Sequence, residues 1–135
     1  MDDAVRVPAP AGLTGAFAEF SSELDGVVGV AVTDVAPAPR PPIILGDWSA
    51  GPAWSTIKVP LVIAALRETN PTTLTPDMIA TIRASDNDAA EAIWASLGNP
   101  GQAARKVQAV LRAAGDDTVV QSVVTAPGHS AFGQT

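Results

Sequence analysis

An α+β domain is the fold class that the sequence predicts, with strands near the start of the chain and helices after them. The valine-rich run Val27–Thr33 and the short apolar run Ile43–Leu45 both have the composition of a strand. After residue 54, apolar residues at helical spacing alternate with capping residues and glycines, which is typical of successive helices. Two strands make a poor sheet on their own, so the predicted sheet is incomplete.

The first 50 residues are predicted to hold a lead-in, a helix and the two strands. Residues 1–12 are rich in proline and alanine and are expected to be a flexible lead-in to a single domain over residues 13–135. A helix is expected next, ending at Asp25-Gly26, because apolar residues recur there at helical spacing: Leu13, Ala16, Phe17, Phe20 and Leu24. Pro37 to Pro42 contains four prolines and is predicted to be the loop between the strands.

The helix at the centre of the fold is expected to begin at Trp54 or Ser55 and to stop at Asn70-Pro71. Its segment Val59–Leu66 is apolar on every face, and a helix of that kind is typical of a protein interior. Pro60 falls within the first turns, where a missing backbone N–H costs least.

Three more helices are expected, each bounded by a capping residue, a proline or a glycine. They are Asp77 to Ala84, a second that follows the break at Ser85–Asp88 and runs to about Leu97, and Gly101 to Ala114. The valine-rich stretch Thr118 to Thr125 is predicted to be extended, and Ala126 to Thr135 to be a loop.

Composition limits the possible functions. The chain has 135 residues, 47% hydrophobic and 16% charged, which fits one domain with a core and not a disordered chain. Its formal net charge of −6 disfavours nucleic acid as a partner. It has no cysteine and no apolar run long enough for a transmembrane helix. The start, Met1-Asp2-Asp3, lacks the features of a signal peptide, which leaves a cytoplasmic protein and a mature secreted domain open.

The first candidate motif is Ser55-Thr56-Ile57-Lys58, a serine and a lysine one helical turn apart at the head of the central helix. A serine hydroxyl is a weak nucleophile and needs an adjacent base. An amine that is removed from water favours its neutral form and can accept the proton. Such a pair occurs by chance on the order of 0.1 times in a chain like this, so alone it also fits a helix cap followed by a solvated lysine.

The second candidate motif is Ser85-Asp86-Asn87, at the break between two predicted helices. All three residue types favour helix starts, so this tripeptide also has a purely structural reading as a cap. The occurrence of this tripeptide after the Ser55/Lys58 pair, in this order, favours a functional site formed by both motifs over two unrelated helix caps. Trp54 stands beside Ser55 and is a candidate wall of that site. The one histidine, His129, lies in a Pro/Gly/Ser loop. A Ser–His–Asp triad would have to use it, but this position favours a plain loop histidine.

Together these motifs resemble those of the serine β-lactamases and penicillin-binding peptidases. Ser55-Thr56-Ile57-Lys58 is similar to the first motif of that superfamily, and Ser85-Asp86-Asn87 to the second. Leu97-Gly98-Asn99-Pro100 and Ala114–Val119 resemble the matching segment of class A β-lactamases, and Ala131–Thr135 would lead into the next helix. The resemblance covers residues 13 to 135. It implies a β-lactamase/transpeptidase-like fold, with a helical lobe and an antiparallel sheet.

The resemblance also implies a role for each motif residue. Ser55 would attack a carbonyl carbon and form an acyl-enzyme, with Lys58 as its base. Ser85 would pass the proton to the leaving nitrogen, and Asn87 would hydrogen-bond the substrate amide or Lys58. Asp86 would be structural. The implied substrate is a small molecule or peptide, either a β-lactam or a cell-wall peptide, and neither a metal nor a cofactor is needed.

Several family features have no counterpart in the sequence. The third motif, Lys-Thr/Ser-Gly on an inner strand, is absent, and no glutamate follows Glu91 to serve in deacylation. Ser55 and Ser85 are thirty residues apart, about half the expected spacing, so the helical lobe is trimmed. We therefore expect an N-terminal portion of such a protein, truncated before the third-motif strand, and whether it is active alone is left open. Its open sheet edge would favour self-association or a complementing chain. The family usually works outside the cytoplasm, so an extracytoplasmic location is expected.

Two alternatives remain at this stage. The chain could be a non-catalytic domain of β-lactamase-like fold that binds a cell-wall ligand, a peptide or a protein partner. It could also be an ordinary α/β domain in which both motifs are only helix caps.

Overall fold

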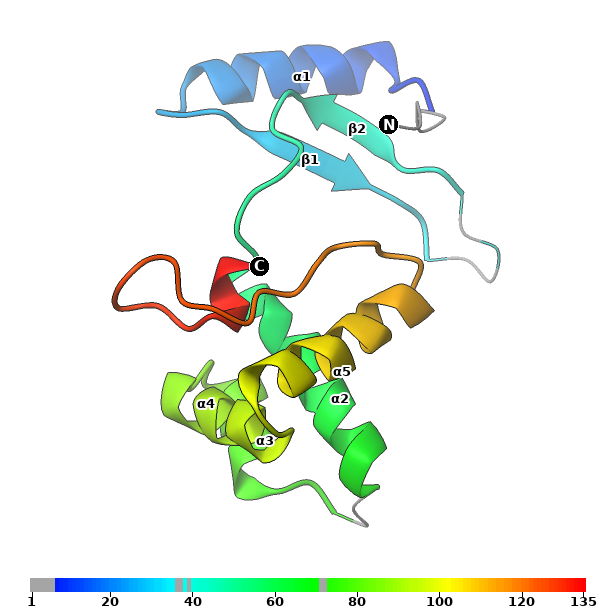
Figure 1. Cartoon of the computed structure of the whole chain (residues 1–135). Helices are drawn as coiled ribbons and strands as arrows, with labels where there is room; N and C mark the ends of the chain where they lie inside the picture. Colours follow the sequence, from blue (N-terminus) through cyan, green and yellow to red (C-terminus); the bar gives the residue numbers. More distant parts are fainter. Residues whose placement is uncertain (1–6, 36–37, 39, 71–72) are drawn as a thin grey trace. The chain divides into compact units, whose positions relative to one another are not determined.

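The structure is a computed structural model that describes residues 7–35, 38, 40–70 and 73–135 (Figure 1). The chain divides into two compact units, Met1–Gly51 and Pro52–Thr135, and each is described by itself. Three parts lie outside the described residues: residues 1–6 of the predicted lead-in, Pro37 and Pro39 of the predicted loop, and Pro71 after the central helix.

The first unit contains a helix and a two-stranded antiparallel sheet. Strand β1 (Gly29–Val32) pairs with β2 (Ile43–Gly46), with Gly29 opposite Gly46 and Val32 opposite Ile43. Helix α1 (Ala11–Ser22) lies along this sheet (Figure 1). Gly46 has a φ of 79°, and a Cβ there would lie 3.0 Å from the Phe17 ring, so the close packing of α1 requires a glycine.

Helix α1 begins at Ala11, two residues earlier than predicted, because the carbonyl of Pro10 accepts hydrogen bonds from Leu13 and Thr14. Strand β1 is shorter than the predicted Val27–Thr33, since β2 provides partners for only four residues. The α+β class is confirmed.

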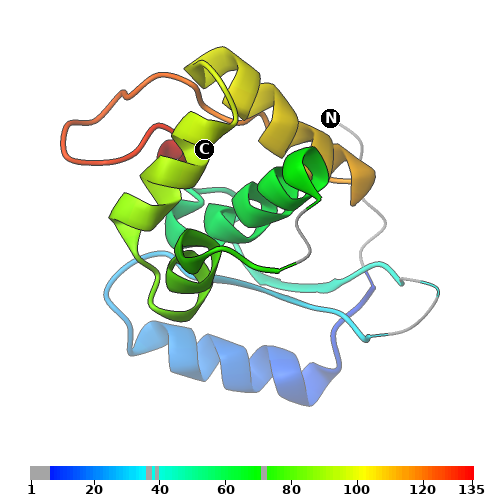
Figure 2. The same cartoon turned by 90° about the horizontal axis from the view of Figure 1, so that it is seen from below.

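The second unit is built around helix α2 (Lys58–Thr69), which follows a 3₁₀ turn, η1 (Trp54–Ile57). Helices α3 (Pro76–Arg83), α4 (Asn87–Ser96) and α5 (Pro100–Ala113) all contact α2 (Figures 1 and 2). The largest fully buried side chains lie in this unit: Phe132, Leu61, Val107 and Thr81.

The expectation that α2 is enclosed on every face is wrong for one face. Val59 is 54% exposed and Ile63, one turn later, is 36% exposed. The packed helices cover the side of α2 that carries Leu61, Ala64 and Ala65, which are almost completely buried. The start of the helix was also predicted too early, because Trp54 to Ile57 form a 3₁₀ turn and Lys58 is the first α-helical residue.

The end of the chain is more ordered than the predicted loop. A 3₁₀ turn, η2 (Phe132–Gln134), buries Phe132 against Trp94, with the two ring centroids 5.2 Å apart. The preceding valine-rich stretch forms no strand in the described part of the chain, and its anchor is Val120, which is buried and donates its N–H to Gln108 Oε1 at 3.1 Å.

A capping box begins α5 and provides a stability prediction. The Asn99 side chain accepts a hydrogen bond from Gln102 N–H at 3.0 Å, and Gln102 Oε1 accepts one from Asn99 N–H at 2.9 Å. We expect Asn99→Ala to lower the free energy of unfolding by about 1 kcal/mol, because it removes the acceptor for an otherwise unpaired helix N–H. Urea unfolding measures the loss. Gln121→Ala, at an exposed side chain, is the control, and an equal loss in both variants would contradict the role of the cap.

None of the helices within the described residues has both the length and the apolar character needed to cross a membrane.

Candidate active site

Ser55 is presented at the entrance to α2 by a strained backbone. It is the second residue of η1, and its side chain is exposed. Trp54, immediately before it, has a φ of 49°, in the left-handed region that bulky residues seldom occupy. Such conformations cost about 1–3 kcal/mol and cluster at functional sites. Among the described carbonyls, none accepts a hydrogen bond from Ser55 N–H, which leaves this donor free for an oxyanion.

The second motif forms the turn between α3 and α4. Ser85 has a φ of 53°, another left-handed residue other than glycine. Asp86 is the N-cap of α4 and accepts a hydrogen bond from Ala89 N–H at 2.9 Å. Asp86 therefore has the structural role expected of it, and its capping directs Ser85 and Asn87, on either side, toward the start of α2.

Lys58 connects the two motifs. Its side chain is 3% exposed, and Nζ donates to Ser85 O at 2.5 Å, to Ser85 Oγ at 3.0 Å and to Asn87 Oδ1 at 2.7 Å. Three acceptors therefore satisfy the three N–H groups of a lysine ammonium. The alternative that Lys58 is a solvated surface lysine is excluded by this burial.

Ser55 and Lys58 are linked through Ser85. The Ser85 hydroxyl donates to Ser55 Oγ at 3.1 Å and accepts from Lys58 Nζ at 3.0 Å. The described contacts of Nζ do not include Ser55 Oγ. Lys58, which the sequence suggested as the base next to Ser55, is therefore connected to Ser55 through the Ser85 hydroxyl. The structure brings Ser55, Lys58, Ser85 and Asn87 together, although they come from three separate elements.

A cavity of about 360 Å³ opens beside these residues. Three segments line it: the start of α2 with the turn before it, helix α4 and the C-terminal segment. The lining residues are Trp54, Ser55, Lys58, Asn87, Glu91, Gly128, His129, Ser130, Phe132 and Gly133. Trp54 is 49% exposed and is one of the residues that line this cavity. By contrast, Trp94 is buried in the core.

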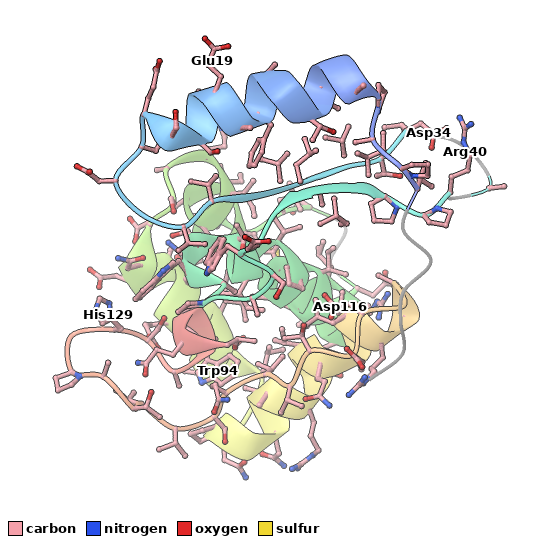
Figure 3. All side chains as sticks on the ribbon, turned by 90° about the horizontal axis from the view of Figure 1, so that it is seen from above. Glu19, Asp34, Arg40, Trp94, Asp116 and His129 are labelled. Carbon is pink, nitrogen blue, oxygen red and sulfur yellow. The ribbon has the colours of Figure 1, made fainter. Side chains whose placement is uncertain are left out.

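Sequence reasoning did not assign three polar residues of the cavity to the site: Glu91, His129 and Ser130. His129, on the C-terminal loop in Figure 3, packs edge-on against Trp54 with ring centroids 4.8 Å apart. Glu91 also lines the cavity, and burial raises the pKa of its carboxyl group. A sequence signal for Glu91 existed, since it lies four residues after Asn87 and therefore on the same side of α4.

One side chain, Gln134, fixes the path of the C-terminal loop. Its Oε1 accepts hydrogen bonds from the backbone N–H groups of Thr125 and Ala126, both at 2.8 Å. Its Nε2 lies 3.3 Å from His129 O and 3.2 Å from Ser130 O. The next residue, Thr135, accepts a hydrogen bond from Ala53 N–H at 2.8 Å, beside the turn that carries Ser55.

Other charged groups have polar partners of their own. Arg40 pairs with Asp34 in the first unit (Figure 3). Hydrogen bonds from the Thr118 side chain and from Thr118 N–H, the latter at 2.8 Å, lower the pKa of the Asp116 carboxyl, as fits a turn residue. Within the ranges that the structure describes, no three histidine, aspartate or glutamate side chains converge to form a metal site.

Comparisons with protein-family models and with curated protein sequences found no match to this chain.

Proposed function

We propose that the chain is a serine acyl-transfer enzyme of the penicillin-recognising type, with Ser55 as nucleophile. The observation that carries the proposal is the hydrogen-bonded series Ser55 Oγ–Ser85 Oγ–Lys58 Nζ at the edge of a cavity. A helix cap explains Asp86, but it does not explain a buried lysine of the first motif that contacts Ser85 and Asn87 of the second. The left-handed residues Trp54 and Ser85, both at this site, support the same assignment.

In the proposed reaction, Ser55 Oγ attacks the carbonyl carbon of an amide or β-lactam. For this step Lys58 first loses one of its three N–H protons to solvent and the Ser85 hydroxyl turns to donate to the resulting amine, so that the Ser55 proton passes through Ser85 Oγ to Lys58. The negative oxygen of the tetrahedral intermediate is stabilised by Ser55 N–H. The C–N bond then breaks, and the leaving nitrogen takes the proton back from Lys58 through Ser85. Asn87 holds Lys58 in place, and Trp54 and His129 offer ring surfaces to the substrate.

The substrate class proposed is a β-lactam or a cell-wall peptide, as the resemblance in the motifs implies. The proposed fold family is accordingly β-lactamase/transpeptidase-like, and the proposed location is outside the cytoplasm. No step of this mechanism requires a metal or a cofactor.

A fluorescent penicillin tests the proposal directly. We expect the wild-type chain to gain the mass of one penicillin and to become fluorescent in a denaturing gel, because an acyl-serine survives unfolding. Ser55→Ala should lose this label completely. Ser49→Ala, at an exposed serine in the first unit, is the matched control and should label as the wild type does. A wild-type chain that gains no adduct at millimolar penicillin would contradict the proposal.

A non-catalytic binding domain is the second candidate. The observation that favours it is that all three donors of Lys58 are occupied by Ser85 and Asn87. Such a domain would bind a cell-wall ligand or peptide reversibly in the same cavity. It predicts saturable binding in equilibrium dialysis that Ser55→Ala leaves intact, with no covalent adduct.

A further inference from the structure

The two charged residues that line the cavity, Lys58 and Glu91, differ in what they offer to a substrate. Lys58 is 3% exposed and directs its three N–H groups to Ser85 and Asn87, so it has no donor left for a carboxylate on the substrate. In the proposed acylation step, Lys58 is also a neutral amine. The charge that a substrate meets in the cavity is therefore chiefly that of Glu91.

Glu91 has no partner of its own among the described residues. It lies on α4 and is the one carboxylate among the described residues that line the cavity. The ion pairs found among the described residues are Arg40–Asp34 and Lys106–Glu68, so neither involves Glu91. Burial raises the pKa of its carboxyl group, and no hydrogen bond or positive charge within the described part of the chain opposes that shift. A positive charge on a ligand would replace the stabilisation by water that this carboxylate has lost.

The aromatic lining of the cavity also suits a cation. Trp54 is 49% exposed and lines the same cavity as Glu91. The face of an indole ring carries partial negative charge and attracts an ammonium group. The formal net charge of the chain, −6, acts in the same direction at longer range. A carboxylate and an indole ring in one cavity favour an ammonium group and disfavour an anion.

We propose that this cavity selects acyl donors that carry an ammonium group, and that Glu91 binds this group. The inference rests on the proposed function and narrows its substrate class. Among the peptides and β-lactams that acylate Ser55, those with an amino group on the acyl side of the scissile bond are preferred over those that are neutral or anionic there. Glu91 takes part in no bond that forms or breaks. Its side chain is exposed, so we expect a moderate preference, about fivefold.

Three penicillins that differ at one carbon test this preference. Benzylpenicillin, ampicillin and carbenicillin share their ring system and a phenyl-bearing acyl group, in which one carbon carries a hydrogen, an ammonium group or a carboxylate, respectively. Full-length wild type is mixed with equal concentrations of all three at about pH 6.5, where an α-amino group is protonated. The reaction is stopped early, and intact mass gives the amount of each adduct. We expect most adduct from ampicillin, less from benzylpenicillin and least from carbenicillin.

Glu91→Gln removes the charge and nearly keeps the shape of the side chain. We expect the ratio of ampicillin adduct to benzylpenicillin adduct to be about fivefold higher in the wild type than in this variant. Each ratio is measured within one sample, so a general loss of activity does not change it. Asp88→Asn is the matched control, because Asp88 is exposed on the same helix but is not among the residues that line the cavity. Its ratio should equal that of the wild type, and thermal unfolding establishes that both variants are folded.

The outcomes separate this inference from the function it rests on. If Glu91→Gln keeps the wild-type ratio, Glu91 does not bind the ammonium group and the inference is overturned, although Ser55 remains the nucleophile. Equal reductions of the ratio in Glu91→Gln and Asp88→Asn would assign the preference to the net charge of the chain and would overturn it as well. If the wild type acquires no adduct from any of the three penicillins, the proposed function fails and this inference fails with it.

Discussion

Replacing Lys58 with methionine is expected to lower the rate of Ser55 acylation by at least about 10³-fold. Methionine has a similar length and fits a buried position, but it has no amine to accept the serine proton. Removal of the base from a nucleophile–base pair typically costs several orders of magnitude in rate. The rate at which the fluorescent penicillin adduct forms measures the effect.

Lys106 provides a matched control, because it is the other lysine in the sequence. It is paired with Glu68 at 2.6 Å, both groups being partly exposed, and such pairs contribute little to stability. Lys106→Met should therefore acylate at the wild-type rate. A Lys58→Met variant that is folded and acylates within a factor of about ten of the wild type would show that Ser55 is activated by another group.

The second large effect is on stability. Leu61 is 0% exposed, in the first turns of the helix that follows Ser55. We expect Leu61→Ala to lower the free energy of unfolding by about 2–5 kcal/mol, because it removes buried methyl groups and leaves a cavity that neighbouring helices fill only in part. Because domains are stable by only about 5–15 kcal/mol, this is a large fraction of the total.

Urea unfolding measures this loss, and Leu74→Ala is its control. Leu74 is 56% exposed, so its truncation should change stability by no more than about 0.5 kcal/mol. If both variants lose the same free energy of unfolding, and the slope of that free energy against urea concentration is unchanged, α2 is not the centre of the core.

Local sequence patterns predicted most of the secondary structure. The caps at Thr75, Asp86 and Asn99 each accept a hydrogen bond from the helix that they begin, because this chemistry depends only on neighbouring residues. Gly98 and Gly115 follow α4 and α5 with positive φ values for the same reason. Two errors, the exposed face of α2 and the ordered turn at Phe132, concern contacts between distant segments.

The site was predictable only in part. Spacing placed Ser55 and Lys58 one turn apart, but it could not reveal that Ser85 Oγ lies between them, because that depends on how the turn between α3 and α4 meets the start of α2. His129 was assigned to a plain loop, since nothing local places it against Trp54. Its position depends on Gln134, five residues further along.

Because of the hydrogen bonds of Gln134, a side chain that the C-terminal loop presents to the cavity can be substituted while the loop keeps its path. They involve backbone groups of residues 125, 126, 129 and 130, whereas Thr125 and Ser130 also form hydrogen bonds through their side chains. At residues 126 and 129, therefore, the hydrogen bonds that set the course of the loop do not depend on which side chain is present. Position 129 can therefore present a different side chain to the cavity while Ser55, Ser85 and Lys58 stay in place. In a protein built this way, the preference for a substrate could change by single substitutions, independently of the groups that carry out the reaction.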